Sequence, residues 1–220
     1  MAEPATRLIP DDAAGRETAI AALRAGAVVG LPTDTVYGIA VALGTAGGVE
    51  RLFAAKDRPP DKAIMVLADG TDQVEAVVEW PPAARALAAL WPGGLTLVLP
   101  LRPGAPIPAA LTAGTRTLGV RIPDHPTARA LARALGPLPT TSANRSGAPA
   151  ALDASEVVAA LSGRVALVID GGRSPGGTAS TVVDCSVARP TILRPGAIPT
   201  DRLAAILEES GIDHALGAIG

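Results

Sequence analysis

The sequence contains few aromatic residues and very few lysines. Phe, Trp and Tyr together make up 2% of the 220 residues, so a core must be built from Ala, Val, Leu and Ile. The lysines, Lys56 and Lys62, both belong to one short segment, 56–62. A lysine ammonium is a compact point charge, whereas arginine presents a planar fork. Confining lysine to one segment indicates phosphate binding there, and a solvated charged loop is the alternative.

Other absences exclude whole classes of protein. The single cysteine, Cys185, rules out an internal disulfide and fits a reducing compartment. No apolar run reaches the roughly 18 residues that a membrane-spanning helix needs, and the first residues do not resemble a signal peptide. We therefore expect a cytoplasmic protein without a membrane partner. A net charge of −2 argues against a surface coated with positive charge for nucleic acid, but not against a local basic cleft.

Several standard nucleotide and metal motifs are also missing. The sequence has no Gly-x-x-x-x-Gly-Lys-Ser/Thr loop, and no Gly-x-Gly-x-x-Gly follows a predicted strand. The two histidines, His125 and His214, have no Cys or carboxylate at metal-ligand spacing, so we expect no protein metal site. No Gly-x-Ser-x-Gly segment supports a serine triad, although composition alone does not exclude one.

The apolar pattern alternates between the helical and the strand period. Helices are expected at 12–25, 45–55, 81–90, 126–135, 153–161 and 200–210. Thr45 is the expected N-cap of the second helix, and Asp153 and Glu156 are arranged like a capping box at the start of the fifth. Strands are expected at 27–31, 63–68, 95–99, 118–122, 165–169, 180–185 and 191–194. This alternation favours an α/β fold, and the short connections late in the chain favour some antiparallel pairing. We predict one domain, 1–220, with a twisted mixed parallel/antiparallel sheet and helices packed on it.

Polar residues concentrate in segments predicted as loops, at 32–38, 140–147 and 171–180. Such loops carry the chemistry of many α/β proteins. Thr117, Gly119 and Arg121 are spaced by two, so they share one face if the strand begins at residue 117. A glycine between them leaves room for a ligand to approach the backbone.

Each of these polar residues also has a purely structural interpretation. Thr33, Ser142 and Asn144 are equally suited to forming turns. Arg121 lies in an apolar strand, where an arginine is almost never buried unpaired, so it needs a carboxylate or a phosphate. An ion pair within the protein would satisfy it too. Tyr37 could stack on a base, but a lone tyrosine more often belongs to the core.

Taken together, these segments resemble the YrdC family, the threonylcarbamoyl-AMP synthases, in its short single-domain form. The resemblance runs in the family's order over roughly 15–200, the expected core of the domain. It rests on 32–38, Lys56-x-Arg58 with Lys62, 91–96, 120–126, 142–147, and Ser180-Thr181 with 193–196. The Lys-x-Arg and Ser-x-Asn motifs are specific for this family when they occur together, although either motif alone is weak evidence for it. The resemblance implies a twisted α/β sheet with a concave basic cleft.

The resemblance also implies an activity. Members of this family condense L-threonine, bicarbonate and ATP to threonylcarbamoyl-AMP and pyrophosphate. This nucleotidyl transfer, with Mg²⁺ accompanying ATP, serves the threonylcarbamoyladenosine modification of tRNA. Downstream partners would then be tRNA or tRNA-modification proteins.

The expected site residues fall into three groups. The catalytic pair would be Lys56 and Arg58. The predicted ATP-binding residues are Lys56, Arg58, Lys62, Thr117, Ser142, Asn144 and Arg194. The predicted threonine-binding residues are Thr33, Arg121, Thr140 and Ser180.

Two departures from the family pattern affect these expectations. The sequence continues for about one helix beyond Arg194-Pro195-Gly196, where some relatives carry a linker and a second domain, so we expect the short form. Many relatives place a histidine in the strand after the basic segment, but 63–68 is wholly apolar here, which puts that substrate contact in doubt. Two alternatives remain open: a non-catalytic RNA-binding module of the same fold, and a different carbamoyl transferase.

Overall fold

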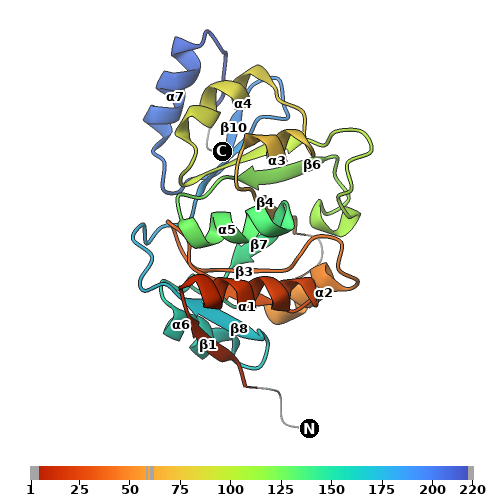
Figure 1. Ribbon diagram of the computed structural model, residues 1–220. Helices are drawn as coiled ribbons and strands as arrows, with labels where there is room; N and C mark the ends of the chain where they lie inside the picture. Colours follow the sequence, from red (N-terminus) through yellow and green to blue (C-terminus); the bar gives the residue numbers. More distant parts are fainter. Residues whose placement is uncertain (1–4, 58, 60–61, 218–220) are drawn as a thin grey trace.

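The computed structural model describes residues 5–57, 59 and 62–217 (Figure 1). Within them, ten strands form one sheet in the order β1-β8-β2-β3-β7-β4-β6-β5-β9-β10. The strands are β1 (Arg7–Pro10), β2 (Val29–Leu31), β3 (Gly38–Ala40), β4 (Met65–Leu67), β5 (Leu95–Pro100), β6 (Thr117–Arg121), β7 (Leu138–Ser142), β8 (Leu167–Asp170), β9 (Thr181–Asp184) and β10 (Thr191–Arg194). The helices are α1 (Ala13–Arg24), α2 (Gly48–Ala55), α3 (Thr71–Glu75), α4 (Pro82–Leu87), α5 (Pro126–Leu135), α6 (Ala154–Leu161) and α7 (Thr200–Glu209).

The sheet is mixed, as the sequence predicts. The pairs β1–β8, β2–β8, β4–β6 and β5–β9 are parallel, and the remaining neighbours are antiparallel. The late pair β9–β10 is antiparallel, which its short connection requires. Figure 1 shows α4 beside α7 at one end of the molecule and α1 beside α5 near its middle. No helix of the described part is long and apolar enough to cross a membrane.

Two central strands lie where the sequence predicts loops. β3 and β7 pair with each other, and β7 also pairs with β4, so both belong to the middle of the sheet. β3 has only three residues, Gly-Ile-Ala, and β7 is polar and threonine-rich, so neither shows a clear strand pattern, although β-branched threonine suits a strand. The strand β1 and the short helix α3 are also absent from the predicted elements.

The predicted helix boundaries hold best where a cap fixes them. Asp153 accepts a hydrogen bond from the Glu156 backbone N–H at 2.9 Å, so α6 begins at the predicted capping box. The predicted cap Thr45 is wrong, because α2 begins after Gly47 and the Thr45 hydroxyl donates to the Ala42 carbonyl at 2.8 Å. The predicted helix 81–90 is α4 followed by a 3₁₀ turn, Ala88–Leu90.

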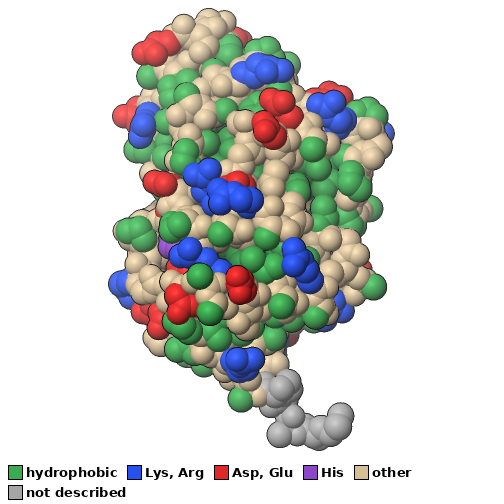
Figure 2. Space-filling view, viewed as in Figure 1, with side chains coloured by type: hydrophobic (Ala, Val, Ile, Leu, Met, Phe, Trp, Pro, Cys, Tyr) green, Lys and Arg blue, Asp and Glu red, His purple; other side chains and the backbone are tan. Residues whose placement is uncertain are grey.

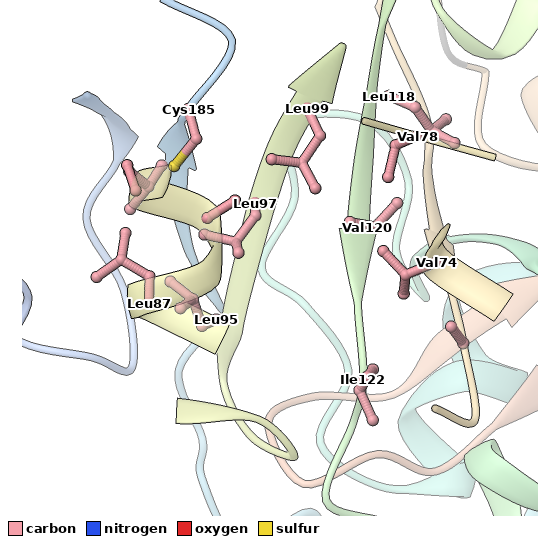
Figure 3. Packing of buried hydrophobic residues seen from close by; sticks show 14 of the residues in the cluster. Val74, Val78, Leu87, Leu95, Leu97, Leu99, Leu118, Val120, Ile122 and Cys185 are labelled. Atoms are coloured by element: carbon pink, nitrogen blue, oxygen red, sulfur yellow. The ribbon is translucent and has the colours of Figure 1, made fainter. Parts of the chain in front are cut away.

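Strand alternation divides the residues of β5 and β6 between two environments. Leu97, Leu99 and Val120 are fully buried on one face, where they join a cluster under α4 and α7 (Figure 3). Successive side chains of a strand point to opposite faces. The residues between them therefore face the other side of the sheet, where they line a cavity.

Candidate functional site

A cavity of about 500 Å³ lies over one face of the sheet. Every second residue of four neighbouring strands contributes to its wall, as the two-residue period requires. These residues are Met65 and Leu67 of β4, Thr117, Gly119 and Arg121 of β6, Thr96 and Val98 of β5, and Val182 and Asp184 of β9. A Cβ at Gly119 would lie 3.2 Å from the Met65 Cβ, so the glycine keeps this wall open.

The cavity brings together most of the predicted site residues. Its wall includes Thr33, Thr117, Arg121, Thr140, Ser142, Ser180 and Arg194. Thr117, Gly119 and Arg121 share a face, as their spacing predicts. Lys56 and Asn144 are not among the residues of the described wall. Lys62 is exposed, and Arg58 lies outside the described residues.

Lys56 is almost completely buried, with 2% of its surface exposed. Its Nζ donates to the carbonyl oxygens of Ser142 and Asn144 at 2.5 and 2.6 Å, and to the Asn144 Oδ1 at 3.0 Å. The Lys56 carbonyl accepts from the Ser146 N–H at 3.0 Å. An ammonium has three donors, which matches these three acceptors in number. Because the acceptors belong to Ser142 and Asn144, the contacts join the segment after α2 to the end of β7 and the turn that follows it. Direct contact between Lys56 and ATP stays a prediction.

The Ser-x-Asn pair is part of this junction. The Ser142 hydroxyl lies 2.5 Å from the Asn144 Oδ1, and the Asn144 Nδ2 donates to the carbonyls of Arg145 and Ala148 at 2.9 and 2.6 Å. The amide therefore stabilises the turn, which was the structural alternative for this residue. Ser142 lines the cavity, and Asn144 stabilises the turn through its hydrogen bonds without lining the cavity.

Arg121 is 4% exposed and has three protein acceptors. Its Nη2 and Nη1 donate to the Asp34 Oδ1 at 2.5 Å and the Thr35 Oγ1 at 2.8 Å, and its Nε donates to the Gly93 carbonyl at 2.9 Å. Burial lowers the pKa of Arg121, and the Asp34 carboxylate opposes that effect. The internal ion pair left open by the sequence is thus present. A guanidinium has five N–H groups, and the described residues accept from three of them, which leaves two for a ligand.

The segment after β2 is folded around hydroxyl groups. The Thr33 Oγ1 donates to the Val36 carbonyl at 2.6 Å and lies 3.0 Å from the Thr35 Oγ1. Thr33 is therefore a turn former as well as part of the cavity wall. The Ser174 hydroxyl donates to the Thr33 carbonyl at 2.9 Å, which attaches the 171–180 segment to this turn.

Ser180 and Arg194 form a second polar group in the wall. The Arg194 Nη2 donates to the Ser180 carbonyl at 2.7 Å and to the Ser180 Oγ at 3.1 Å. The Ser180 Oγ also lies 2.8 Å from the Thr96 Oγ1. Burial lowers the pKa of Arg194, but an arginine stays charged in proteins. The arginine and the two hydroxyls therefore form a fixed hydrogen-bonding surface.

Tyr37 belongs to the core and is not available to stack on a base. It is fully buried, and its hydroxyl donates to the Gly172 carbonyl at 2.8 Å and accepts from the Gly171 N–H at 3.0 Å. Burial raises the pKa of Tyr37 to about 12. Its role is to hold the start of the 171–180 segment against β3.

A titration of the phenol tests this placement. Tyr37 is the single tyrosine of the chain, so phenolate absorbance reports on it alone. In the native protein we expect little phenolate at pH 10–11, because burial raises the pKa from 10.0 to about 12. The unfolded chain should ionise near the ordinary value of about 10. Native ionisation near pH 10 would contradict the buried hydrogen bonds.

Sequence reasoning missed several members of the site. Asp34 and Thr35 support Arg121, Thr96 supports Ser180, and Asp184 lines the far end of the cavity. Asp34 had one usable signal: it directly follows the threonine singled out after a predicted strand. Nothing local connects it to Arg121, which is 87 residues away in the sequence.

The surface outside the cavity gives no sign of a large polyanion-binding face in the view shown. In Figure 2, basic and acidic side chains are interspersed rather than separated by sign. Several form pairs, such as Arg129 and Arg133 with Asp69 at 3.1 and 2.8 Å. This face therefore does not support the RNA-binding alternative.

Comparison with known proteins identifies relatives over most of the chain. The family model described as Telomere recombination, Sua5_yciO_yrdC, matches residues 21–196. A threonylcarbamoyl-AMP synthase of Bacillus subtilis is 39% identical over 201 residues, which is 90% of this chain and 58% of that protein. A putative threonylcarbamoyl-AMP synthase of Mycobacterium tuberculosis is 39% identical over 203 residues, 91% of each chain. This chain thus spans little more than half of the first relative and most of the second.

A solved structure agrees with the fold. The crystal structure of Pyrococcus abyssi Sua5 complexed with L-threonine superposes with a TM-score of 0.86 at 33% identity. The match covers 96% of this chain and 62% of that one.

Proposed function

The chain belongs to the Sua5/YciO/YrdC family, and from that premise we propose that it is a threonylcarbamoyl-AMP synthase. It would condense L-threonine, bicarbonate and ATP to threonylcarbamoyl-AMP, pyrophosphate and water, a nucleotidyltransferase reaction. The observation that supports this most directly is that one cavity is lined by residues of both predicted groups, Arg121 and Ser180 for threonine, and Ser142 and Arg194 for ATP.

The two substrates would occupy different ends of this cavity. Arg121 shares a sheet row with Leu138 through Leu67. Ser142 lies four residues further along β7, about 13 Å at the usual rise of a strand. Near Arg121, two remaining guanidinium N–H groups would hold the carboxylate of threonine. Near Ser142, the turn fixed by Lys56 would receive the triphosphate.

Catalysis of this kind rests on positioning and charge rather than on a covalent enzyme nucleophile. Bicarbonate and the amino group of threonine together give a carbamate. Its carboxylate must meet the α-phosphate of ATP while the negative charge of the leaving pyrophosphate is neutralised. We assign that neutralisation to the basic segment 56–62, with Lys62 at its exposed end. Thr117 lies on the same wall, where its hydroxyl would contact the nucleotide.

We propose that Mg²⁺ enters together with ATP. Among the described residues, no group of three or more His, Cys, Asp or Glu side chains is arranged to hold a metal ion. This suits Mg²⁺, which keeps several waters and is commonly bound through substrate phosphates. When bound, the ion would neutralise negative charge on the phosphates.

The decisive assay is pyrophosphate release from ATP with threonine and bicarbonate omitted in turn. We expect release only when all three substrates are present. Steeply salt-dependent RNA binding without pyrophosphate release would instead support the RNA-binding module. Release that needs bicarbonate but not threonine would favour a different carbamoyl transferase. A cytoplasmic location and tRNA-modification partners belong to the same proposal and follow from the expected product.

Selectivity among amino acids provides a further prediction. Serine lacks one methyl group of threonine, so we expect serine to be used roughly 10- to 200-fold less efficiently. Valine lacks the hydroxyl and should be worse, because the hydroxyl-rich wall around Thr33, Thr140 and Ser180 would keep an unpaired polar partner. Competition of the three amino acids in the pyrophosphate assay measures this. Equal use of valine and threonine would contradict the hydroxyl-binding role.

A further inference from the structure

Asp184 is the one acidic side chain in the described wall of the cavity. It is the last residue of β9 and is half-buried. The other charged groups of that wall are the cations Arg121 and Arg194. A carboxylate in a site that receives a triphosphate is unfavourable beside the phosphates, so it has to serve another part of the ligand.

Among the described residues, donors reach only one oxygen of this carboxylate. The Asp184 Oδ1 accepts from the Ser186 N–H at 2.9 Å and from the Ser186 Oγ at 2.6 Å. Its Oδ2 has no hydrogen-bond donor among the described residues. An ionised carboxylate can only accept hydrogen bonds. The side chain is thus held in one orientation and offers a single acceptor to a ligand that carries a donor.

The sheet places Asp184 far from the predicted phosphate site. Val98 pairs with Gly119 on one side and with Asp184 on the other, so these residues share a row. From β7, which carries Ser142, to β9 there are four strand steps. At the usual spacing of about 4.8 Å, that is about 19 Å across the sheet. The uncharged end of a nucleotide would therefore reach Asp184 when its phosphates lie near Ser142.

The neighbours of Asp184 suit a flat base better than a sugar. Val98, Val182 and Leu193 line the same end of the cavity, and Leu193 is 59% exposed. Together they offer an apolar surface beside the Asp184 Oδ2, which is a charged hydrogen-bond acceptor. A purine with an exocyclic amino group has this combination of an apolar face and a donor at its edge.

We propose that Asp184 accepts a hydrogen bond from the exocyclic amino group of the nucleotide base, and that it thereby selects ATP over nucleotides that lack this group. The proposal rests on the proposed function, because that function places ATP in this cavity. A single available oxygen matches the single amino group of adenine. Guanine presents two donors side by side, which a carboxylate holds best with both oxygens, and Ser186 already occupies one.

The test compares ATP with purine riboside triphosphate, in which hydrogen replaces the 6-amino group. With the unmodified protein we expect the analogue to have about a 10- to 100-fold lower kcat/KM, mostly through KM, because it loses a charge-assisted hydrogen bond. In Asp184→Ala the two nucleotides should differ by less than about twofold, because the partner of the amino group is gone. In Asp184→Asn the amide oxygen would stay with Ser186 and the NH2 group would face the base, so the penalty of the analogue should again be lost although the shape is kept. Asp213→Ala removes an exposed carboxylate paired with Arg189 and should keep the full penalty.

An unchanged penalty in both folded Asp184 variants would overturn the proposal. A second contrary result would be that the Asp184 variants lose discrimination against 2′-deoxy-ATP or 3′-deoxy-ATP but keep it against purine riboside triphosphate. The carboxylate would then bind the ribose. Calorimetric binding of the same nucleotides separates this proposal from the proposed function. If the protein releases no pyrophosphate, the function fails, while the difference in affinity between ATP and the analogue still decides the role of Asp184.

Discussion

Replacing Lys56 by methionine should abolish measurable ATP binding and lower the free energy of unfolding by about 3 kcal/mol or more. Methionine keeps much of the length of lysine but removes the ammonium. Three oxygens of Ser142 and Asn144 would then lose the ammonium as a donor. The Ser142 carbonyl would keep the Asn144 N–H and the Asn144 Oδ1 would keep the Ser142 hydroxyl, so the Asn144 carbonyl is the one left without another donor among the described residues. Because a buried acceptor without a partner costs about 1–3 kcal/mol, the turn that carries Ser142 should loosen. Calorimetry with ATP and denaturant-induced unfolding measure the two effects.

Lys62→Ala is the matched control for this change. Lys62 belongs to the same basic segment but is exposed, so its removal should change stability by no more than about 0.5 kcal/mol. It should still weaken ATP binding if the segment receives the triphosphate. A Lys56→Met protein that unfolds like the unmodified chain and binds ATP normally would contradict the role of this junction. A loss of stability with unchanged ATP affinity would limit Lys56 to the fold.

Replacing Arg121 by alanine should cost about 3–5 kcal/mol of stability and eliminate threonine-dependent pyrophosphate release. The change would leave Asp34 as an unpaired carboxylate, and Thr35 and the Gly93 carbonyl would lose their donor. Breaking a buried ion pair from one side is costly because the remaining charge has no compensation. Denaturant-induced unfolding gives the stability, and the pyrophosphate assay gives the activity.

Arg121→Lys separates the catalytic consequence from the structural one. Lysine keeps the charge but cannot reproduce the planar fork, so the KM for threonine should rise while ATP affinity changes little. Arg133→Lys serves as the control, because the Arg133–Asp69 pair is exposed on the arginine side and such pairs contribute about 1 kcal/mol or less. If ATP affinity falls in Arg121→Lys and threonine handling does not, Arg121 belongs to the nucleotide end.

The elements whose apolar pattern is complete can be predicted from the amino-acid sequence. In β5 and β6 every second residue is a large aliphatic that packs under α4 and α7, so the strand period is visible without any structure. The same period placed Thr117, Gly119 and Arg121 on one face. Helix α6 begins after Asp153, whose carboxylate accepts from the Glu156 N–H, because capping signals act within a few residues.

The strands and contacts that form the cavity follow only from how distant segments of the chain pack together. β3 and β7 line it with Gly38, Thr140 and Ser142, so the alternation of apolar and polar residues that marks a strand is blurred there. The partners of the two buried cations are equally invisible locally. Asp34 lies 87 residues from Arg121, and Lys56 lies 86 residues from Ser142. Only packing of the sheet brings these groups within hydrogen-bond distance, because burial obliges each charge to find its acceptors wherever the fold provides them.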